Sequence, residues 1–202
     1  MSTFLSPEYW ENRYKKSGNS GAGSYGRLAE FKADVINSFV AEKKINSVIE
    51  FGCGDGNQLS LFKVPFYVGH DVSYSAIQKL QEHYFNDDSK MFYHSTVFEY
   101  AMKSSLTLSL DVIYHLIEDD VYDDYMRRLF DASKKYVIIY SCNRNDIVPD
   151  DHIRFRVFLK WVLERRPEFK LIKIIENKYP YDKSDPNNTS WCDFYIFERC
   201  NK

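Results

Sequence analysis

The sequence predicts an α/β fold in which helices alternate with the strands of a mostly parallel sheet. The first observation is the stretch 45–51, a short apolar run that stops at a set of glycines, as buried parallel strands do. The second is the order of the later segments. Further short apolar runs alternate with segments of helical periodicity, the runs at 64–70, 91–94, 106–110 and 136–140 and the helices at 74–86 and 119–133.

The composition is that of an ordinary globular chain and excludes several classes of protein. At 202 residues we expect one domain, and a net charge of −2 provides no broad positive surface for nucleic acid. No apolar run is long enough for a membrane span, and the N-terminus has no signal pattern. The four cysteines form no C-x-x-C pair and the histidines no H-x-x-x-H pair. We therefore expect reduced thiols, a cytoplasmic protein and no dedicated metal site.

A glycine-rich turn directly after the first strand is the strongest functional signal. Gly52, Gly54 and Gly56 alternate, and glycine lets a ligand approach the backbone closely. A dinucleotide fingerprint would place its third glycine where Asn57 stands. Glu50, two residues before the first glycine, disfavours a pyrophosphate but suits a cationic ligand. Taken alone, the turn could also be an ordinary loop.

A second acid also indicates a ligand at this turn. Asp71 ends the next predicted strand, 71 − 54 = 17 residues after Gly54, close to the roughly 20 of an acid that binds ribose hydroxyls. The patterns E-x-G-x-G-x-G from Glu50 and D-x-S from Asp71 to Ser73 resemble the class I S-adenosylmethionine (SAM)-dependent methyltransferases. SAM carries an ammonium, a sulfonium and a ribose but no phosphate, which fits these acids.

The resemblance implies a fold and a cofactor. The fold would be a Rossmann-like seven-stranded sheet, mostly parallel with an antiparallel C-terminal strand and helices on both faces. The segments 169–176 and 191–199 are similar to the closing antiparallel pair of that sheet. The whole chain, 1–202, would form a single methyltransferase domain. SAM would be the cofactor and S-adenosylhomocysteine (SAH) the product.

The resemblance also implies the cofactor-binding residues. The family usually has an acid after the third strand to hold the adenine amine. Here the sequence is His94-Ser-Thr-Val97, so a hydroxyl or backbone group would have to replace it. The implied cofactor contacts in the sheet are Glu50, Gly52, Cys53, Gly54, Asp71, Val72, Thr96, Val97, Phe98 and Asp111.

Residues 1–43 are predicted to form an N-terminal helical lid. A helix at 7–16 leads into the glycine- and serine-rich stretch 17–26, and a second helix begins at Arg27. The alternative for 17–26 is a flexible linker, but a segment tethered at both ends behaves more like a lid. The Y-W-x-x-R-Y pattern at 9–14 is similar to a segment that covers SAM in small-molecule methyltransferases. The implied contacts are Tyr9, Tyr14, Ser24 and Gly26 to the cofactor and Tyr25 to the acceptor.

The sequence Asp111-Val-Ile-Tyr-His115 follows the fourth predicted strand and resembles the D-V-x-x-H motif of the family. The resemblance places its residues near the transferred methyl group, with Tyr114 on the acceptor side. Imidazole titrates near neutral pH, so His115 is the candidate general base. The alternatives are a histidine that positions the acceptor and one that only supports the strand end. We interpret the four aspartates of 119–124 as a solvated helix face.

The acceptor is the least determined part of the prediction. A helix expected at 152–164 would make His152 and Arg156 neighbours, with Arg154 on the other flank. Arg154 and Arg156 are predicted to bind an anionic acceptor; the alternative is that they pair with nearby aspartates on the surface.

We predict methyl transfer to an oxygen of a small acceptor. This compact chain with its Y-W-x-x-R-Y segment resembles methyltransferases of bacterial surface-polysaccharide and modified-sugar pathways. That resemblance implies a sugar or a nucleotide-linked or phosphate-bearing polysaccharide precursor as the acceptor. A nucleic-acid methyltransferase is one alternative, although the net charge disfavours it. A SAM-binding protein without catalysis is another. The oligomeric state stays open.

Overall fold

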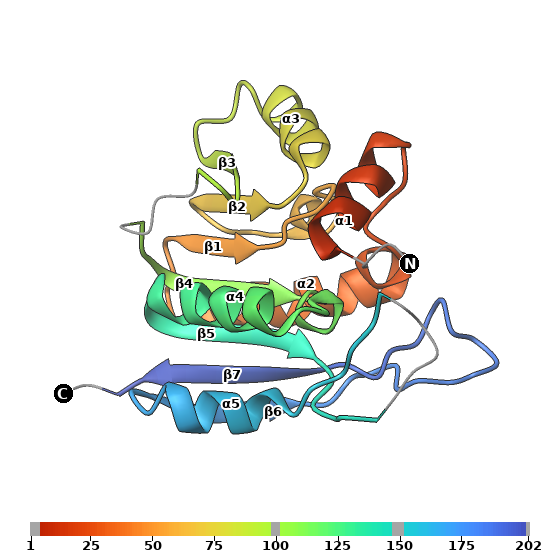
Figure 1. The fold of residues 1–202 in the computed structure, drawn as a ribbon. Coiled ribbons are helices and arrows are strands. Elements are labelled where there is room, and N and C mark those ends of the chain that lie inside the picture. Colours follow the sequence, from red (N-terminus) through yellow and green to blue (C-terminus); the bar gives the residue numbers. More distant parts are fainter. Residues whose placement is uncertain (1–4, 98–101, 147–151, 201–202) are drawn as a thin grey trace.

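The computed structural model describes residues 5–97, 102–146 and 152–200, and Figure 1 shows the arrangement of its elements. The helices are α1 Ser6–Lys15, α2 Gly26–Glu42, α3 Tyr74–His83, α4 Asp119–Asp131 and α5 Phe158–Arg165. The strands are β1 Val48–Phe51, β2 Tyr67–Asp71, β3 Lys90–His94, β4 Ser104–Leu110, β5 Ser133–Ser141, β6 Phe169–Ile175 and β7 Asp193–Arg199. Three short 3-10 helices are η1 Ala22–Ser24, η2 Leu59–Leu61 and η3 Ile113–His115.

The seven strands form one sheet in the order β3-β2-β1-β4-β5-β7-β6. The pairs from β3 across to β5 are parallel, and β7 is antiparallel to both β5 and β6. The predicted fold is therefore confirmed, including the antiparallel C-terminal strand. Its functional consequence is that the carboxyl ends of β1, β2 and β4 lie side by side at one edge of the sheet (Figure 1).

The sheet is covered on both faces because its strands present apolar side chains alternately to either side. One core packs α2 and α3 against the strands through Ile36, Ile77 and Leu80. The other core packs α4 and α5 through Met126 and Phe158. In Figure 1, α4 and α5 lie in front of the sheet, and α1 crosses the region beyond the carboxyl ends of the strands.

The helix starts follow ordinary local chemistry. Ser73 caps α3, where its side chain accepts a hydrogen bond from the Ala76 amide at 3.1 Å. Pro7 lies in the first turn of α1, where its missing N–H costs no hydrogen bond. Asp119 and Asp120 lie in the first turn of α4 and complement the helix dipole.

The prediction of a helix over 152–164 is wrong in its first half. The helix begins only at Phe158, and residues 152–157 are non-helical, with an isolated bridge between Asn143 and Arg156. His152 and Arg156 are therefore not helical neighbours. A helical sequence pattern is overridden when the backbone of the segment pairs with another part of the chain. Here the backbone of Arg156 pairs with that of Asn143.

Across the described residues, no helix is both long and apolar enough to pass through a lipid bilayer.

Candidate functional site

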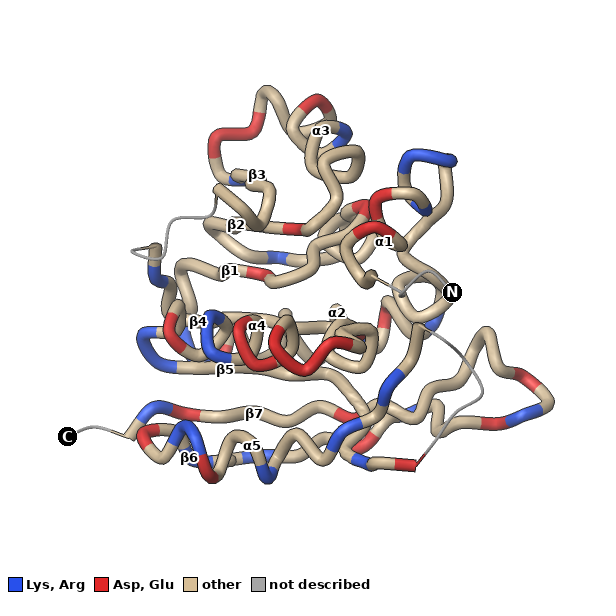
Figure 2. The backbone as a smooth tube through the Cα atoms, viewed as in Figure 1, with Lys and Arg blue, Asp and Glu red and all other residues tan. Residues whose placement is uncertain are grey.

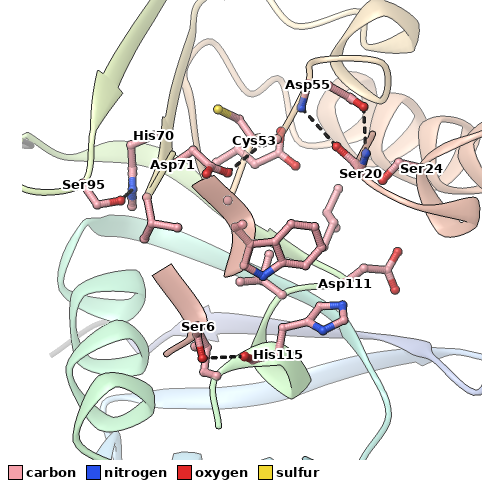
Figure 3. A pocket seen from close by; sticks show the side chains of 18 of the residues that line it. Ser6, Ser20, Ser24, Cys53, Asp55, His70, Asp71, Ser95, Asp111 and His115 are labelled. Carbon is pink, nitrogen blue, oxygen red and sulfur yellow. Dashed lines mark hydrogen bonds between the residues drawn. The ribbon is translucent and has the colours of Figure 1, made fainter. Parts of the chain in front are cut away.

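A cavity lies at the carboxyl edge of β1, β2 and β4, under α1 and η1. Figure 3 shows it with Asp71, His70 and Ser95 on one side and Asp111 and His115 on the other. Ten of the predicted site residues line it: Tyr14, Ser24, Glu50, Gly52, Cys53, Gly54, Asp71, Val72, Asp111 and His115. The sequence motifs that lie far apart in the chain thus meet at one place.

The glycine turn is as tight as the sequence predicts. Gly52 has a φ of 82° and Gly54 a φ of 55°, values that L-residues rarely adopt. A Cβ on Gly52 would lie 2.6 Å from a Val112 methyl, and one on Gly54 would lie 2.3 Å from the Ser20 hydroxyl oxygen. Both positions therefore need glycine for two reasons, the backbone angle and the close approach of other segments.

Asp71 is held at the end of β2 by backbone amides. Its Oδ2 accepts a hydrogen bond from Gly54 N at 3.0 Å, and its Oδ1 accepts one from Ser73 N at 2.9 Å. Burial raises the pKa of this carboxyl, although the amide hydrogen bonds oppose the shift. The carboxylate is thus fixed between the glycine turn and the start of α3, and it lines the cavity.

Glu50 lies in β1, between the strands that carry the two aspartates. Its side chain is buried and accepts a hydrogen bond from the Tyr67 hydroxyl. Burial raises the pKa of Glu50 to about 7, against the opposing effects of the Tyr67 hydroxyl and the Lys32 charge. A positive charge in the cavity would favour the ionised carboxylate.

Asp111 follows β4 and is held by side chains. Lys32 of α2 places its Nζ 2.6 Å from Oδ2, and the Tyr114 hydroxyl donates to Oδ1 at 3.0 Å. The backbone of Asp111 has a φ of 59°, in the left-handed region that a non-glycine residue rarely occupies. The chain therefore turns sharply at the end of β4.

His115 has a defined tautomer. Its Nδ1 lies 2.9 Å from the carbonyl oxygen of His152. A carbonyl only accepts, so Nδ1 carries the hydrogen, and the Nε2 of the neutral ring is an acceptor. The Trp10 ring and the imidazole pack nearly perpendicular to each other, with 5.0 Å between ring centroids. In its neutral form His115 can therefore take a proton at Nε2.

The N-terminal segment covers the cavity and is tied to both sides of it. In α1, Ser6 bonds to Glu118, and Glu11 accepts from the Ser73 and Ser75 hydroxyls at 2.7 Å each. These two anchors connect α1 to the chain after β4 and to the chain after β2.

The stretch between α1 and α2 binds the glycine turn itself. Ser20 exchanges two hydrogen bonds with Asp55, at 2.8 and 3.0 Å, and its Oγ lies 3.0 Å from the Tyr14 hydroxyl. The Asn57 amide donates to the Ser24 carbonyl at 2.6 Å. The pKa of Tyr25 is raised to about 12, first by burial and then by the hydrogen bond that its hydroxyl donates to Asp55.

Several predicted residues do not line the cavity. Tyr9 stacks on His152, and Tyr25 and Gly26 lie outside the cavity at the start of α2. Thr96 bonds to His94 and Val97 is 61% exposed, while their neighbour Ser95 does line the cavity. Tyr114 does not line the cavity but contacts two residues that do, Asp111 and His115. Phe98 lies outside the described residues.

The two predicted acceptor arginines serve another purpose. Arg154 donates to the Ile117 carbonyl at 2.7 Å and pairs with Asp119 at 3.0 Å. Arg156 donates to the Leu116 and Ile117 carbonyls and also pairs with Asp119, at 3.1 Å. Asp119 belongs to the acidic start of α4, which is red in Figure 2. Neither arginine lines the cavity, so they provide no anion site within it.

The other residues that line the cavity were not among the predicted contacts. They are Ser6, Pro7, Trp10, Ser20, Lys32, Asp55, Gln58, His70, Ser95, Leu110, Val112, Leu116, Val121 and Tyr125. For Lys32 the sequence does contain an indication of burial, because Lys32 lies four residues from both Leu28 and Ile36 on the apolar face of α2. A charge on a buried face needs a partner. His70, whose pKa burial lowers to about 3, had no such signal.

Within the described part of the chain, no three His, Cys, Asp or Glu side chains are grouped to hold a metal ion. The four cysteines are free thiols, and Cys53 is buried within the glycine turn, between Gly52 and Gly54.

No family model and no curated protein matches the chain. Solved structures do match it. The N-methyltransferase NodS from Bradyrhizobium japonicum WM9, in complex with SAH, is 11% identical and has a TM-score of 0.74, with 97% of this chain and 99% of that chain covered.

Magnesium protoporphyrin IX methyltransferase from Synechocystis PCC 6803, with bound SAH, is 12% identical at a TM-score of 0.69, covering 96% of this chain and 98% of that one. An O-methyltransferase family protein from Burkholderia thailandensis is 12% identical at a TM-score of 0.61, covering 86% of this chain and 56% of that one. The fold of this chain is that of the SAM-dependent methyltransferases.

Proposed function

We propose that the protein is a SAM-dependent methyltransferase that transfers the methyl group to an oxygen atom of a small acceptor. One observation carries the proposal: the glycine turn, Asp71 and His115 line the same cavity. Asp71 is a carboxylate that could bind ribose hydroxyls, and His115 has a ring nitrogen that could accept a proton. A fold shared with N- and O-methyltransferases supports the proposal.

The residues present fit SAM better than a dinucleotide. Glu50, Asp71 and Asp111 all line the cavity, so its wall is rich in carboxylates that suit a sulfonium and an ammonium and oppose phosphate. Asp71 would accept hydrogen bonds from the ribose hydroxyls, and the glycine turn would pass beneath the cofactor. Val72 would pack on the adenine. Ser95 lines the cavity in the place where Thr96 was predicted to act.

The chemistry required of the protein is modest. SAM supplies a methyl group activated by a positive sulfur, which leaves as the thioether of SAH. His115 would accept the hydroxyl proton of the acceptor at Nε2 while the new oxygen–carbon bond forms. Its Nδ1 bond to the His152 carbonyl holds the ring in the tautomer that this step requires. Trp10 packs against the ring and limits its motion.

We further propose that residues 1–43 form a lid on a single domain of residues 1–202. The hydrogen bonds of Ser6, Glu11 and Ser20, which tie this segment to residues on both sides of the cavity, support the proposal. We expect these hydrogen bonds to open when SAM and SAH exchange. Such opening is the usual way in which a covered active site admits its ligand.

For the acceptor we propose a small hydroxyl-bearing molecule such as a sugar, as the resemblance to polysaccharide-pathway enzymes implies. Arg154 and Arg156 give no support to a phosphate group on it, because both are bound to Asp119 and to carbonyl oxygens. The free thiols suit a reducing compartment, and we propose the cytoplasm.

The first experiment is calorimetry of the purified protein with SAM and SAH, followed by incubation with methyl-labelled SAM and fractions of a cell extract. We expect binding of both ligands and a labelled product in some fraction. Binding without any product would favour a SAM-binding protein that does not catalyse. Absence of binding would overturn the proposal.

The second experiment tests the base once an acceptor is found. His115→Ala should lower kcat by about 10²–10⁴-fold, the usual cost of losing a general base, and leave SAM affinity nearly unchanged. His115→Asn keeps hydrogen bonding but cannot take the proton. A near-wild-type kcat for His115→Asn would show that the histidine only positions the acceptor. His83→Ala, at the end of α3, is the matched control.

A further inference from the structure

Two buried cysteines lie opposite each other where β5 pairs with β7, and the proposed chemistry uses neither of them. The two strands are antiparallel neighbours (Figure 1), and their ladder ends with Ser141 opposite Asp193. Continuing that register by one residue places Cys142 opposite Cys192. Both are free thiols, and they are only 3% and 4% exposed.

The two thiols lie on the same face of the sheet. Opposed residues of an antiparallel pair share a face, and every second pair returns to that face. The next pair on it is Tyr140 and Phe194, and this pair packs in the same core as Cys142 and Cys192. The two cysteine side chains are therefore neighbours, although they are far apart in the sequence.

A disulfide bond fits between these positions. The Cα atoms of directly opposed residues in antiparallel strands are about 4.5 to 5.5 Å apart. Disulfides usually join Cα atoms that are about 4.4 to 6.8 Å apart. Hydrogen bonds also hold the backbone in place, because Asn177 Nδ2 donates to the Cys192 carbonyl at 3.0 Å and Cys192 N donates to Ser190 Oγ at 3.1 Å. The bond can thus form with little movement of the backbone.

The pair is protected from casual oxidation. Burial, and after it the hydrogen bond between the two thiols, raises the pKa of Cys192 well above its usual range. The thiolate is the reactive form, so such a thiol reacts slowly while it stays buried. Exposed residues lie nearby in the chain, at 144–146 after Cys142 and at 182–184 and 186–188 before Cys192. Exposed segments open locally more readily than core strands, so a small oxidant can reach the pair without global unfolding.

The pair is connected to the part of the cavity wall that contains Asp111. The Asp111 amide donates to the Tyr140 carbonyl at 3.0 Å, two residues before Cys142. The Tyr114 ring packs against the core that holds both cysteines, and its hydroxyl donates to Asp111 Oδ1 at 3.0 Å. A disulfide brings its two sulfur atoms to about 2.05 Å, closer than two hydrogen-bonded thiols. Because protein interiors are close-packed, this movement is transmitted to neighbouring side chains such as Tyr114.

We propose that Cys142 and Cys192 form an oxidisable dithiol site, which a low-molecular-weight disulfide converts to an internal disulfide with weaker binding of SAM. One cysteine thiolate attacks the small disulfide and forms a mixed disulfide, and the small thiol that leaves takes up the proton of that cysteine. The second cysteine attacks the protein sulfur of the mixed disulfide and releases the second small thiol in the same way. Two protein thiols are thus oxidised, and one small disulfide is reduced to two thiols. The effect on SAM rests on the proposed function, whereas the formation of the bond does not.

The test incubates the full chain with hydroxyethyl disulfide, in a Cys200→Ser background because Cys200 is exposed and would react by itself. Peptide mass mapping should find the Cys142 and Cys192 peptides joined and two hydrogens lighter than the free pair. By calorimetry, the cross-linked protein should bind SAM about fivefold or more weakly, and dithiothreitol should restore the affinity. Cys142→Ala in the same background should bind SAM like the reduced parent and should not respond to the oxidant.

The outcomes separate this inference from the proposed function. If mapping finds the two cysteines only reduced or only as mixed disulfides, the site is overturned, whether or not Cys142→Ala folds. A cross-linked protein that binds SAM as tightly as the reduced protein overturns the effect on the cofactor. If the reduced protein does not bind SAM, the proposed function itself fails, while the mapping still decides whether the disulfide forms.

Discussion

Asp71 and Asp111 are the same residue type at the ends of two parallel strands of one sheet, yet they are held in different ways. Asp71 accepts hydrogen bonds from the backbone amides of Gly54 and Ser73. Asp111 is held by the side chains of Lys32 and Tyr114, and Lys32 is 79 residues away in the sequence. The first carboxylate is fixed by adjacent turns, the second by the packing of a helix.

Because the two carboxylates are held differently, they differ in how freely they can rearrange when a ligand binds. Backbone amides cannot move away without unfolding the turn, so Asp71 offers a rigid acceptor for hydroxyl groups. A lysine side chain can change its partner, so Asp111 belongs to a set of charges that can rearrange around a ligand. We expect changes at Asp71 to act on every ligand that carries the ribose, and changes around Asp111 to depend on the rest of the ligand.

Asp71→Ala should have the largest effect. It removes the carboxylate that we propose accepts hydrogen bonds from two ribose hydroxyls, and hydrogen bonds to charged groups contribute about 1.5–3 kcal/mol each. SAM affinity should therefore fall by about 10²-fold or more. Calorimetry with SAM and with methylthioadenosine, which has the ribose but no amino acid, should show the same loss. Asp88→Ala, on an exposed aspartate, is the control. A loss for SAM alone would contradict the assignment of Asp71 to the ribose.

Glu50 lies between the two aspartates and should make stability depend on pH. Its pKa in the folded protein, about 7, lies above its ordinary value of 4.5. The folded state therefore holds the proton more tightly than the unfolded state. The free energy of unfolding of the ligand-free protein should decrease by at most about 3 kcal/mol as the pH rises from roughly 4.5 to 7.

The measurement is chemical denaturation across that pH range, with Glu50→Gln beside the wild type. The variant should lose this part of the slope. SAM affinity of the wild type should rise with pH over the same range, because ionised Glu50 favours a cationic ligand. A slope that persists in Glu50→Gln would assign it to another group.

Gly23→Ala should disturb only the part of the cavity around Asp111. A Cβ there would lie 2.9 Å from Asp111 Oδ2, tighter than normal contacts allow. Gly23 does not have a positive φ, so its backbone accepts alanine. Overpacking of this kind costs about 1–3 kcal/mol. SAM affinity should fall by roughly tenfold, while methylthioadenosine binds as before. Equal losses for both ligands would mean that the whole cavity had changed.

Ser20→Ala should have the smallest effect, because it removes only hydrogen bonds between the segment 17–26 and its neighbours. The hydroxyl bonds to Asp55 N and Tyr14, and a typical net loss is about 1 kcal/mol. Amide hydrogen exchange across residues 17–26 should become faster by about fivefold, with Ser38→Ala on an exposed face of α2 as the control. No change in exchange would show that this stretch is closed by other contacts.

Local sequence was sufficient to predict the elements whose chemistry is contained in a few neighbouring residues. The glycine turn could be predicted because a tight turn needs positive φ angles, which Gly52 and Gly54 adopt without steric cost. The place of Asp71 in the cavity could be predicted because its partners lie in the two motifs that the sequence shows, the glycine turn and the D-x-S segment. The sheet could be predicted from the alternation of strands and helices, since parallel strands need crossover helices.

The partners of the long charged side chains depend on the tertiary structure. Arg154 and Arg156 bind Asp119 because residues 152–157 leave the helical path and pass beside the start of α4. Lys32 meets Asp111 because α2 packs across the sheet. The His115 tautomer depends on a carbonyl 37 residues away. A long side chain selects its partner by distance in space, and that distance exists only once the chain has folded.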